Sequence, residues 1–314
     1  MKKVVLSILI LIAVIVFIYI NMDLTQEKKK KPVVLTAVEQ TLKVNGKSKK
    51  AFNIIRENGE EGYVGIKGDD FNVRLVNKTS VPISIHWHGI VLPNDQDGVP
   101  YVTQLPIQPG KSHDYHYPLL QAGTYWMHSH FKFHEQDLMT APLILKDPQQ
   151  ANLGDKDVIV MFQSFTFKNP EKIFWELQHQ ADRRMSMQNG GMHAKADLND
   201  VKFDAVLANR HTLQNPQIIQ VKPGEKVRLR LINGSSASNY WVYTGKLEGT
   251  AIAVDGNDIH PIKNNAFQTA VAQRIDVEVT ISEQGGAFPI LGQIEGTGCR
   301  EELFLQLKER SYQS

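Results

Sequence analysis

Residues 83–89 read Ile-Ser-Ile-His-Trp-His-Gly, and residues 126–130 read Trp-Met-His-Ser-His. Both segments are typical of β-strands, in which residues two apart point to the same face. The two histidines of each segment therefore share a face, and two such strands side by side would bring four imidazoles together. Neutral imidazole binds copper, zinc, iron and nickel. One pair would be weak evidence in a chain with 11 histidines, but two pairs predict a metal site. The pairs are His86 with His88 and His128 with His130.

The residues that flank the two pairs are as informative as the pairs. The first pair is followed at 93–100 by Pro-Asn-Asp-Gln-Asp-Gly-Val-Pro, and the second is preceded at 122–126 by Ala-Gly-Thr-Tyr-Trp. This pattern resembles the first domain of the multicopper oxidases, the family of laccases and copper-resistance oxidases. The resemblance covers most of residues 34–298. It is weaker but recognisable in the second half, at 221–225 (Val-Lys-Pro-Gly-Glu) and 228–234 (Arg-Leu-Arg-Leu-Ile-Asn-Gly).

The resemblance implies roles for individual residues. In the family, histidines of the first and last domains hold a three-copper cluster that reduces dioxygen to water. His86 resembles the ligand of the type 2 copper, and the type 3 copper pair would be bound by His88, His128 and His130. Asp97 matches an acid that helps to move protons at the cluster, a role that suits a carboxylate near bound water. The alternative for Asp97 is a turn-forming residue before a glycine, and the sequence leaves both interpretations open.

Many short, apolar-alternating segments separated by turns predict an all-β chain. The resemblance implies two tandem cupredoxin-like Greek-key β-sandwiches, and the apolar run at 4–20 predicts an N-terminal apolar helix before them. An additional helix is expected within residues 170–187, as an insertion rather than part of a sandwich. The expected order is a signal anchor with a Lys-rich juxtamembrane segment at 1–31, a first domain at 32–148, a linker at 149–157, a second domain at 158–298 and an aberrant tail at 299–314.

The composition is that of a globular protein without a nucleic-acid partner. Hydrophobic residues make up 42% of the chain and the formal net charge is +2, and basic patches interleaved with aromatic residues are absent. Cys299 is the only cysteine, which excludes an intrachain disulfide and a cysteine-based zinc site.

Residues 4–20 form a predominantly apolar run after two lysines, at the short end of the range for a membrane-spanning helix. The run ends without the small residues of a signal-peptide cleavage site. We therefore expect an uncleaved anchor in the cytoplasmic membrane. Copper chemistry and the resemblance favour a body in the periplasm or otherwise outside the cytoplasm. Secretion after cleavage of a signal is the alternative.

Residues 185–193 concentrate three methionines and one histidine. Thioether sulfur is a soft ligand that selects cuprous copper, so a cuprous site is one interpretation of Met185, Met187 and Met192. Methionines also fill irregular apolar gaps, and a flexible hydrophobic loop is the favoured interpretation.

The remaining ligands of the family do not occur in the sequence. No His-x-x-His-x-His or His-Cys-His motif follows the second domain, and the neighbours of Cys299 exclude it as a blue-copper thiolate. The resemblance thus implies the N-terminal part of an oxidase that couples one-electron oxidation of phenols or cuprous ions to reduction of dioxygen, inactive by itself. The alternatives are a non-catalytic copper-binding module and a subunit completed in trans by a separate third domain.

The segment after Gly298 breaks the expected strand pattern, whereas a shifted reading frame permits its continuation. We hypothesise a frameshift near codon 298. A locus without a downstream frame for a His-Cys-His domain would contradict this hypothesis.

Overall fold

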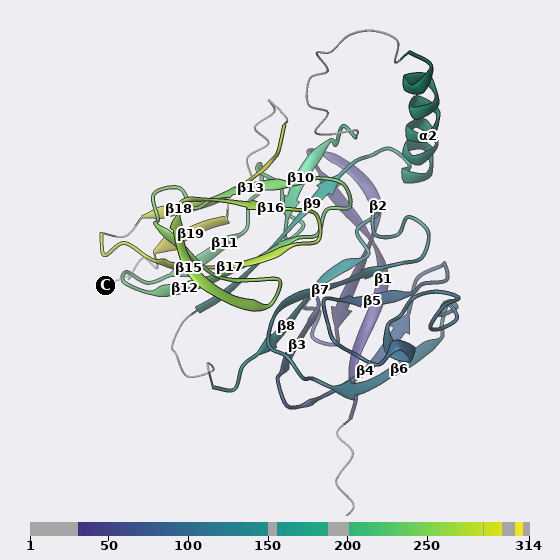
Figure 1. Cartoon of the computed structure of the whole chain (residues 1–314), viewed down its shortest axis with the longest axis horizontal. Helices are drawn as coiled ribbons and strands as arrows, with labels where there is room; N and C mark the ends of the chain where they lie inside the picture. Colours follow the sequence, from purple (N-terminus) through teal and green to yellow (C-terminus); the bar gives the residue numbers. More distant parts are fainter. Residues whose placement is uncertain (1–30, 150–155, 188–200, 285, 297–304, 310–314) are drawn as a thin grey trace, which may run out of the picture. The chain divides into compact units, whose positions relative to one another are not determined.

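The structure is a computed structural model that describes residues 31–149, 156–187, 201–284, 286–296 and 305–309 (Figure 1). Side chains are described for all of these except 180–187 and 305–309. The described residues from Val34 onward belong to one compact unit. Strands dominate them, joined by one α-helix and one short 3-10 helix. The prediction of an all-β chain is therefore confirmed.

The first eight strands form two four-stranded sheets that share one core. The sheet orders are β2-β1-β4-β6 and β3-β8-β7-β5. Phe71 and Tyr115 of the first sheet enclose Trp87 of the second, with ring centroids 4.8 and 4.9 Å from the indole. The bounds are Val33–Val44 (β1), Lys47–Arg56 (β2), Tyr63–Ile66 (β3), Asp70–Asn77 (β4), Ile85–His88 (β5), Asn94–Gln96 (the 3-10 helix η1), Ser112–Pro118 (β6), Gly123–Ser129 (β7) and Thr140–Lys146 (β8).

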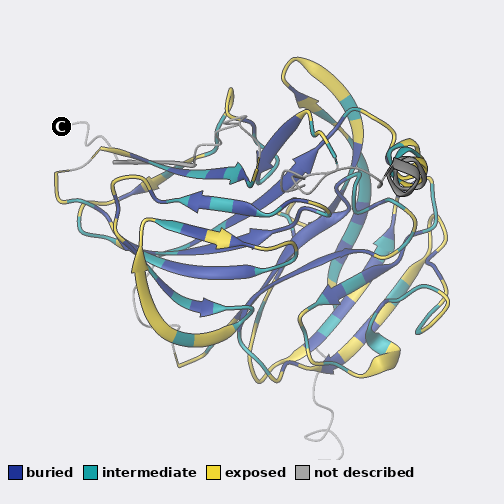
Figure 2. Cartoon of the chain, turned by 45° about the horizontal axis from the view of Figure 1, so that its top comes forward, coloured by how far each residue is buried: buried dark blue, intermediate teal, exposed yellow. Residues whose placement is uncertain are grey.

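The later strands form a second sandwich, from a six-stranded sheet β10-β9-β12-β17-β14-β15 and a five-stranded sheet β11-β19-β18-β13-β16. Phe162 and Tyr240 stack across its core at 5.6 Å. Figure 2 shows the buried residues following the strands, while the connecting loops are mostly intermediate or exposed. The bounds are Lys156–Phe165 (β9), Ala205–Ala208 (β10), Ile218–Val221 (β11), Lys226–Asn233 (β12), Tyr240–Tyr243 (β13), Gly249–Val254 (β14), Asn257–Asn264 (β15), Ala266–Thr269 (β16), Arg274–Thr280 (β17), Ala287–Ile294 (β18) and Leu305–Glu309 (β19).

Strand β7 joins the two sandwiches through one of its faces. Thr124, Trp126 and His128 lie two residues apart and so share that face. Trp126 is buried in a cluster with Met161 and Ile232 of the second sandwich. The same strand therefore packs on the second sandwich and supplies a histidine of the predicted metal site.

A buried ionic network lies at the other end of that face. Asp276, 2% exposed, accepts a hydrogen bond from Thr124 Oγ1 at 2.6 Å. The same carboxylate pairs with Arg228 at 2.6 Å and with Arg230 at 3.3 Å. Arg230 also donates to Thr124 Oγ1 at 3.0 Å and pairs with Asp157 at 2.9 Å. Because each of these charged groups has an opposite charge beside it, the desolvation penalty of burial is offset.

The helix expected within residues 170–187 is confirmed as α2 (Pro170–Met187), which is inserted between β9 and β10 and stands outside the sheets in Figure 1. Asn169 Oδ1 accepts the N–H of Glu171 at 2.7 Å and so satisfies a donor of the first turn. Phe174 of the helix packs on Phe133, with ring centroids 5.3 Å apart.

The expectation that the tail breaks the strand pattern is wrong for residues 305–309. These residues form β19, which pairs antiparallel with β18 and parallel with β11. Apolar Leu305 and Leu307 alternate with polar Gln306 and Lys308, which is the period of a strand. The frameshift itself stays a hypothesis.

The part of the chain that the structure describes contains no helix long and apolar enough to cross a membrane. The run 4–20, expected as an apolar helix and anchor, lies outside the described residues, as do Met192 and Cys299.

Asp276→Ala is expected to lower the free energy of unfolding by about 3–5 kcal/mol, because it removes the carboxylate that two largely buried guanidinium groups share. Urea unfolding followed by tryptophan fluorescence measures the change. The control is Glu248→Ala, which breaks an exposed ion pair with Lys263. It should change the free energy by no more than about 0.5 kcal/mol. Equal losses in both variants would contradict a stabilising role for the buried network.

Candidate metal centre

The histidines converge because β5 and β7 are antiparallel neighbours with a fixed register. Ile85 and Trp87 are fully buried in the first core, which turns His86 and His88 to the opposite face of β5. In the ladder with β7, His86 lies directly opposite His128. The predicted convergence of the two strands is thus present in the structure.

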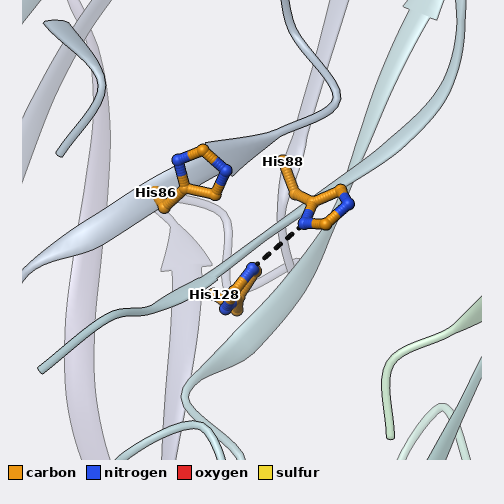
Figure 3. Close-up of side chains that lie close together, drawn as sticks. All are labelled: His86, His88 and His128. Carbon is orange, nitrogen blue, oxygen red and sulfur yellow. Dashed lines mark hydrogen bonds between the residues drawn. The ribbon is translucent and has the colours of Figure 1, made fainter. Parts of the chain in front are cut away.

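Three of the four predicted histidines form a compact group, shown in Figure 3. One ring nitrogen from each of His86, His88 and His128 lies within 4.8 Å of the others. His88 Nδ1 and His128 Nε2 face each other at 3.2 Å. The indole of Trp126 packs against the group and stacks on the His128 ring, with the ring centroids 4.2 Å apart. Such a set of nitrogens can hold a transition-metal ion.

His130, the fourth predicted ligand, adjoins this group without entering it. It follows the last residue of β7 and is exposed, with its ring centroid 4.7 Å from that of His86 and 4.9 Å from that of His128. The predicted cuprous site is not placed, because Met192 and the side chains of Met185 and Met187 lie outside the description. That site stays a prediction.

The environment keeps His88 and His130 in the form that binds metal. Burial, together with the Arg274 guanidinium and the neighbouring imidazoles, lowers the pKa of His88 to about 3. Although His130 is exposed as a residue, partial desolvation of its ring and the neighbouring imidazoles of His128 and His86 also lower its pKa. These rings are therefore neutral at neutral pH, with a lone pair available on one nitrogen.

Asp97 contacts His86 from the loop after β5. One carboxylate oxygen lies 2.9 Å from His86 Nδ1, and the Asp97 backbone oxygen lies 3.1 Å from the same atom. With Nδ1 engaged, Nε2 of His86 is the nitrogen left for a metal. The backbone N–H of Asp97 donates to Asn94 O at 3.3 Å and closes η1, so this residue also forms the turn that was the alternative interpretation.

Gly98 allows the Asp97 loop to approach β5 closely. Its φ is +74°, and a Cβ built on it would lie 1.8 Å from the backbone oxygen of Ile85. Ser84 Oγ donates to the backbone oxygen of Gly98 and holds the loop in place. A glycine is therefore required both for the backbone conformation and for the contact.

Glu135 is a residue of the site that the sequence did not assign. One of its carboxylate oxygens lies 2.8 Å from His128 Nδ1, off the direction of a linear hydrogen bond. The glutamate belongs to the irregular loop between β7 and β8, where no strand period predicts which way a side chain points. Its one sequence signal is its closeness to the second histidine pair.

Comparisons with known proteins agree with this geometry. Two sequence models described as multicopper oxidase match residues 64–150 and 156–311. The chain is 30% identical over 290 residues to copper resistance protein A of Escherichia coli, and the matched region covers 82% of this chain and 47% of that protein. It is 28% identical over 240 residues to multicopper oxidase MmcO of Mycobacterium tuberculosis, which covers 73% and 47%. The chain spans less than half the length of these curated relatives.

Solved structures show the same fold. The blue copper oxidase from Nitrosomonas europaea superposes with a TM-score of 0.68 at 22% identity, covering 89% of this chain and 86% of that chain. A laccase variant from B. aclada superposes with a TM-score of 0.71 at 25% identity, covering 89% and 52%. The prediction of cupredoxin-like β-sandwiches is confirmed.

Gly98→Ala is expected to weaken cupric binding by roughly 10–100-fold, the usual effect of losing a group that orients a metal ligand. The added Cβ displaces the loop and with it the Asp97 carboxylate. Affinity is measured by competition with a chelator. The control is Gly110→Ala, because Gly110 has the same φ of +74° but open space around its Cβ position. Both variants should lose stability through backbone strain, and equal loss of copper affinity in both would contradict the positioning role of this loop.

Proposed function

Because the chain belongs to the multicopper oxidase family, which binds copper, we propose that its histidine pairs provide half of a copper cluster that reduces dioxygen to water. The electrons would come from phenols or cuprous ions, oxidised one electron at a time. The observation that carries this proposal is the convergence of three imidazole nitrogens within 4.8 Å on neighbouring strands.

The residues of the site fit copper. The donors are imidazoles, which suit this metal. At least His88 is held neutral by burial. Carboxylates lie beside Nδ1 of His86 and Nδ1 of His128, the arrangement that orients metal-bound histidines in many proteins. The acidic groups would also offset part of the positive charge of the ion.

Within this proposal the roles follow the resemblance. His86 would hold the type 2 copper, and the type 3 pair would be held by His88, His128 and His130. Copper held by these histidines would supply the one-electron redox chemistry that links the reducing substrate to dioxygen. The chain's own histidines bind and orient the metal, and Trp126 keeps water from the buried side of the rings.

Asp97 would supply protons, which dioxygen reduction consumes. Its carboxylate lies at His86 Nδ1, and its side chain is 29% exposed, so it contacts both the site and solvent. A carboxylate so placed can take a proton from bulk water and release it toward the cluster.

The other half of the cluster would come from a third cupredoxin domain acting in trans. Three side chains in the loop between the two histidine pairs support a docking surface: Tyr101, Val102 and Leu105 are 72%, 78% and 75% exposed. Tyr101 lies beside Phe131, the residue after His130, with ring centroids 6.3 Å apart. An exposed apolar patch next to an incomplete metal site is the surface that a ligand-donating partner would cover. A non-catalytic copper-binding module is the second candidate, because the three convergent nitrogens of His86, His88 and His128 can hold one ion by themselves.

We also propose an extracytoplasmic location, with residues 4–20 as a membrane anchor that follows Lys2 and Lys3. Fractionation of cells that produce the full chain, followed by protease treatment of spheroplasts, tests this. We expect the chain in the membrane fraction and accessible to protease. Recovery in the cytosol would contradict the proposal, and recovery in the medium would favour a cleaved signal.

The full chain is expected to bind cupric copper through imidazole nitrogen. Because two of the three convergent nitrogens are lost, His86→Ala with His128→Ala should lower the affinity by more than the roughly 10–100-fold expected for loss of an orienting partner. Chelator competition with metal analysis measures this. The control is His260→Ala, an exposed histidine of β15. Unchanged affinity in the double variant would contradict the site.

Oxygen uptake separates the two candidate functions. We expect no uptake with a phenol or cuprous ion by the copper-loaded chain alone, and uptake after addition of a third domain that carries the missing histidines. Copper binding without uptake under either condition would favour the non-catalytic module. Uptake by the chain alone would contradict the need for a partner.

A further inference from the structure

Two of the three convergent histidines are contacted in the same way. His86 Nδ1 has the carboxylate of Asp97 at 2.9 Å, and His128 Nδ1 has that of Glu135 at 2.8 Å. The Glu135 side chain is 17% exposed, less than that of Asp97 at 29%. Each ring therefore presents Nε2, the nitrogen away from its carboxylate, to the other histidines.

The loop that carries Glu135 is held by other parts of the chain. Lys49 pairs with Asp137 at 2.7 Å, and the backbone N–H of Phe52 donates to Asp137 O at 2.9 Å. From the loop after β10, Arg210 Nη2 donates to Leu138 O at 2.8 Å. These contacts involve β2 and the second sandwich. The position of the glutamate is thus set independently of any metal.

The proton positions follow from electrostatics at the ring. A carboxylate oxygen of Glu135 lies 2.8 Å from His128 Nδ1, where its negative charge favours a hydrogen on that nitrogen over a lone pair, although the N–H does not point straight at the oxygen. A neutral His128 then has a bare Nε2. Since His88 Nδ1 lies 3.2 Å from that atom, His88 donates and His128 accepts. With Glu135 present, hydrogen lies on Nδ1 of His128 and on Nδ1 of His88. Without the glutamate, His128 can adopt either tautomer.

We propose that Glu135 is the positioning residue of His128. It holds the ring as the Nδ1–H tautomer, with the Nε2 lone pair directed at the other histidines. This deepens the proposed function, and it rests on that function only where copper is concerned. Loss of the carboxylate should leave the fold intact and lower copper affinity, because part of the population would then present a protonated nitrogen to the metal.

The test uses the full-length apo chain with 15N-labelled histidine. Long-range 1H–15N correlation spectra at neutral pH report which nitrogen of each imidazole carries hydrogen, and a His128→Gln spectrum assigns the resonance. We expect Nδ1–H at His128 in the wild type and in Glu135→Gln, because the amide oxygen still accepts. Glu135→Ala should show a mixture of tautomers.

The matched control is Asp137→Asn, which breaks an ion pair of the same loop without contacting His128. It should keep the Nδ1–H tautomer. In chelator competition with cupric ion, Glu135→Ala should bind roughly 10–100-fold more weakly than the wild type, and Glu135→Gln should recover part of the loss.

Hydrogen on Nε2 of His128 in the wild type would overturn the proposal, and so would an unchanged Nδ1–H tautomer in Glu135→Ala. A tautomer mixture in Asp137→Asn as large as that in Glu135→Ala would also overturn it, since the effect would then come from the loop. If the wild type shows the expected tautomer but binds no copper, the proposed function fails and the assignment of Glu135 stands.

Discussion

The antiparallel pairing of β5 with β7 is the constraint on which the rest of the site depends. Strand alternation places Ile85 and Trp87 in the first core, so the two histidines between and after them must face the other way. The register then sets His86 against His128. A shift of β5 by one residue would turn the imidazoles into the first core and Trp87 out of it. The change would cost free energy, so the register is strongly specified.

The same face of β7 links the site to the second sandwich. Thr124 bonds with Asp276, Trp126 packs on Met161, and His128 joins the metal group, all from alternate positions of one strand. The second sandwich therefore fixes the strand from which the second histidine pair emerges. The carboxylates of Asp97 and Glu135, from two different loops, complete the arrangement by contacting Nδ1 of His86 and Nδ1 of His128.

The parts of the site that could be predicted are those that depend on local periodicity. The spacing within each histidine pair indicated a shared face, because alternation is a property of the strand itself. Glu135 could not be found in this way, since its loop is irregular and is held by Lys49 and Arg210, which are remote in sequence. Asp97 was assigned through the resemblance, and the structure shows that it closes a turn and contacts His86 at once.

The fold shows a similar division. The all-β class followed from periodic patterns. Strand β19 was missed because the charged residues Arg300, Glu301 and Glu302 precede it and obscure an alternation that is only five residues long. Its pairing with β11 and β18 is a long-range contact, which local pattern does not report.

The most direct measurement is diffraction from copper-loaded crystals of the full chain, with data collected on both sides of the copper absorption edge. The account predicts an anomalous peak among the rings of His86, His88 and His128, next to Nε2 of His86 and Nε2 of His128. Copper located only at histidines outside this group, with these three rings unliganded, would contradict it.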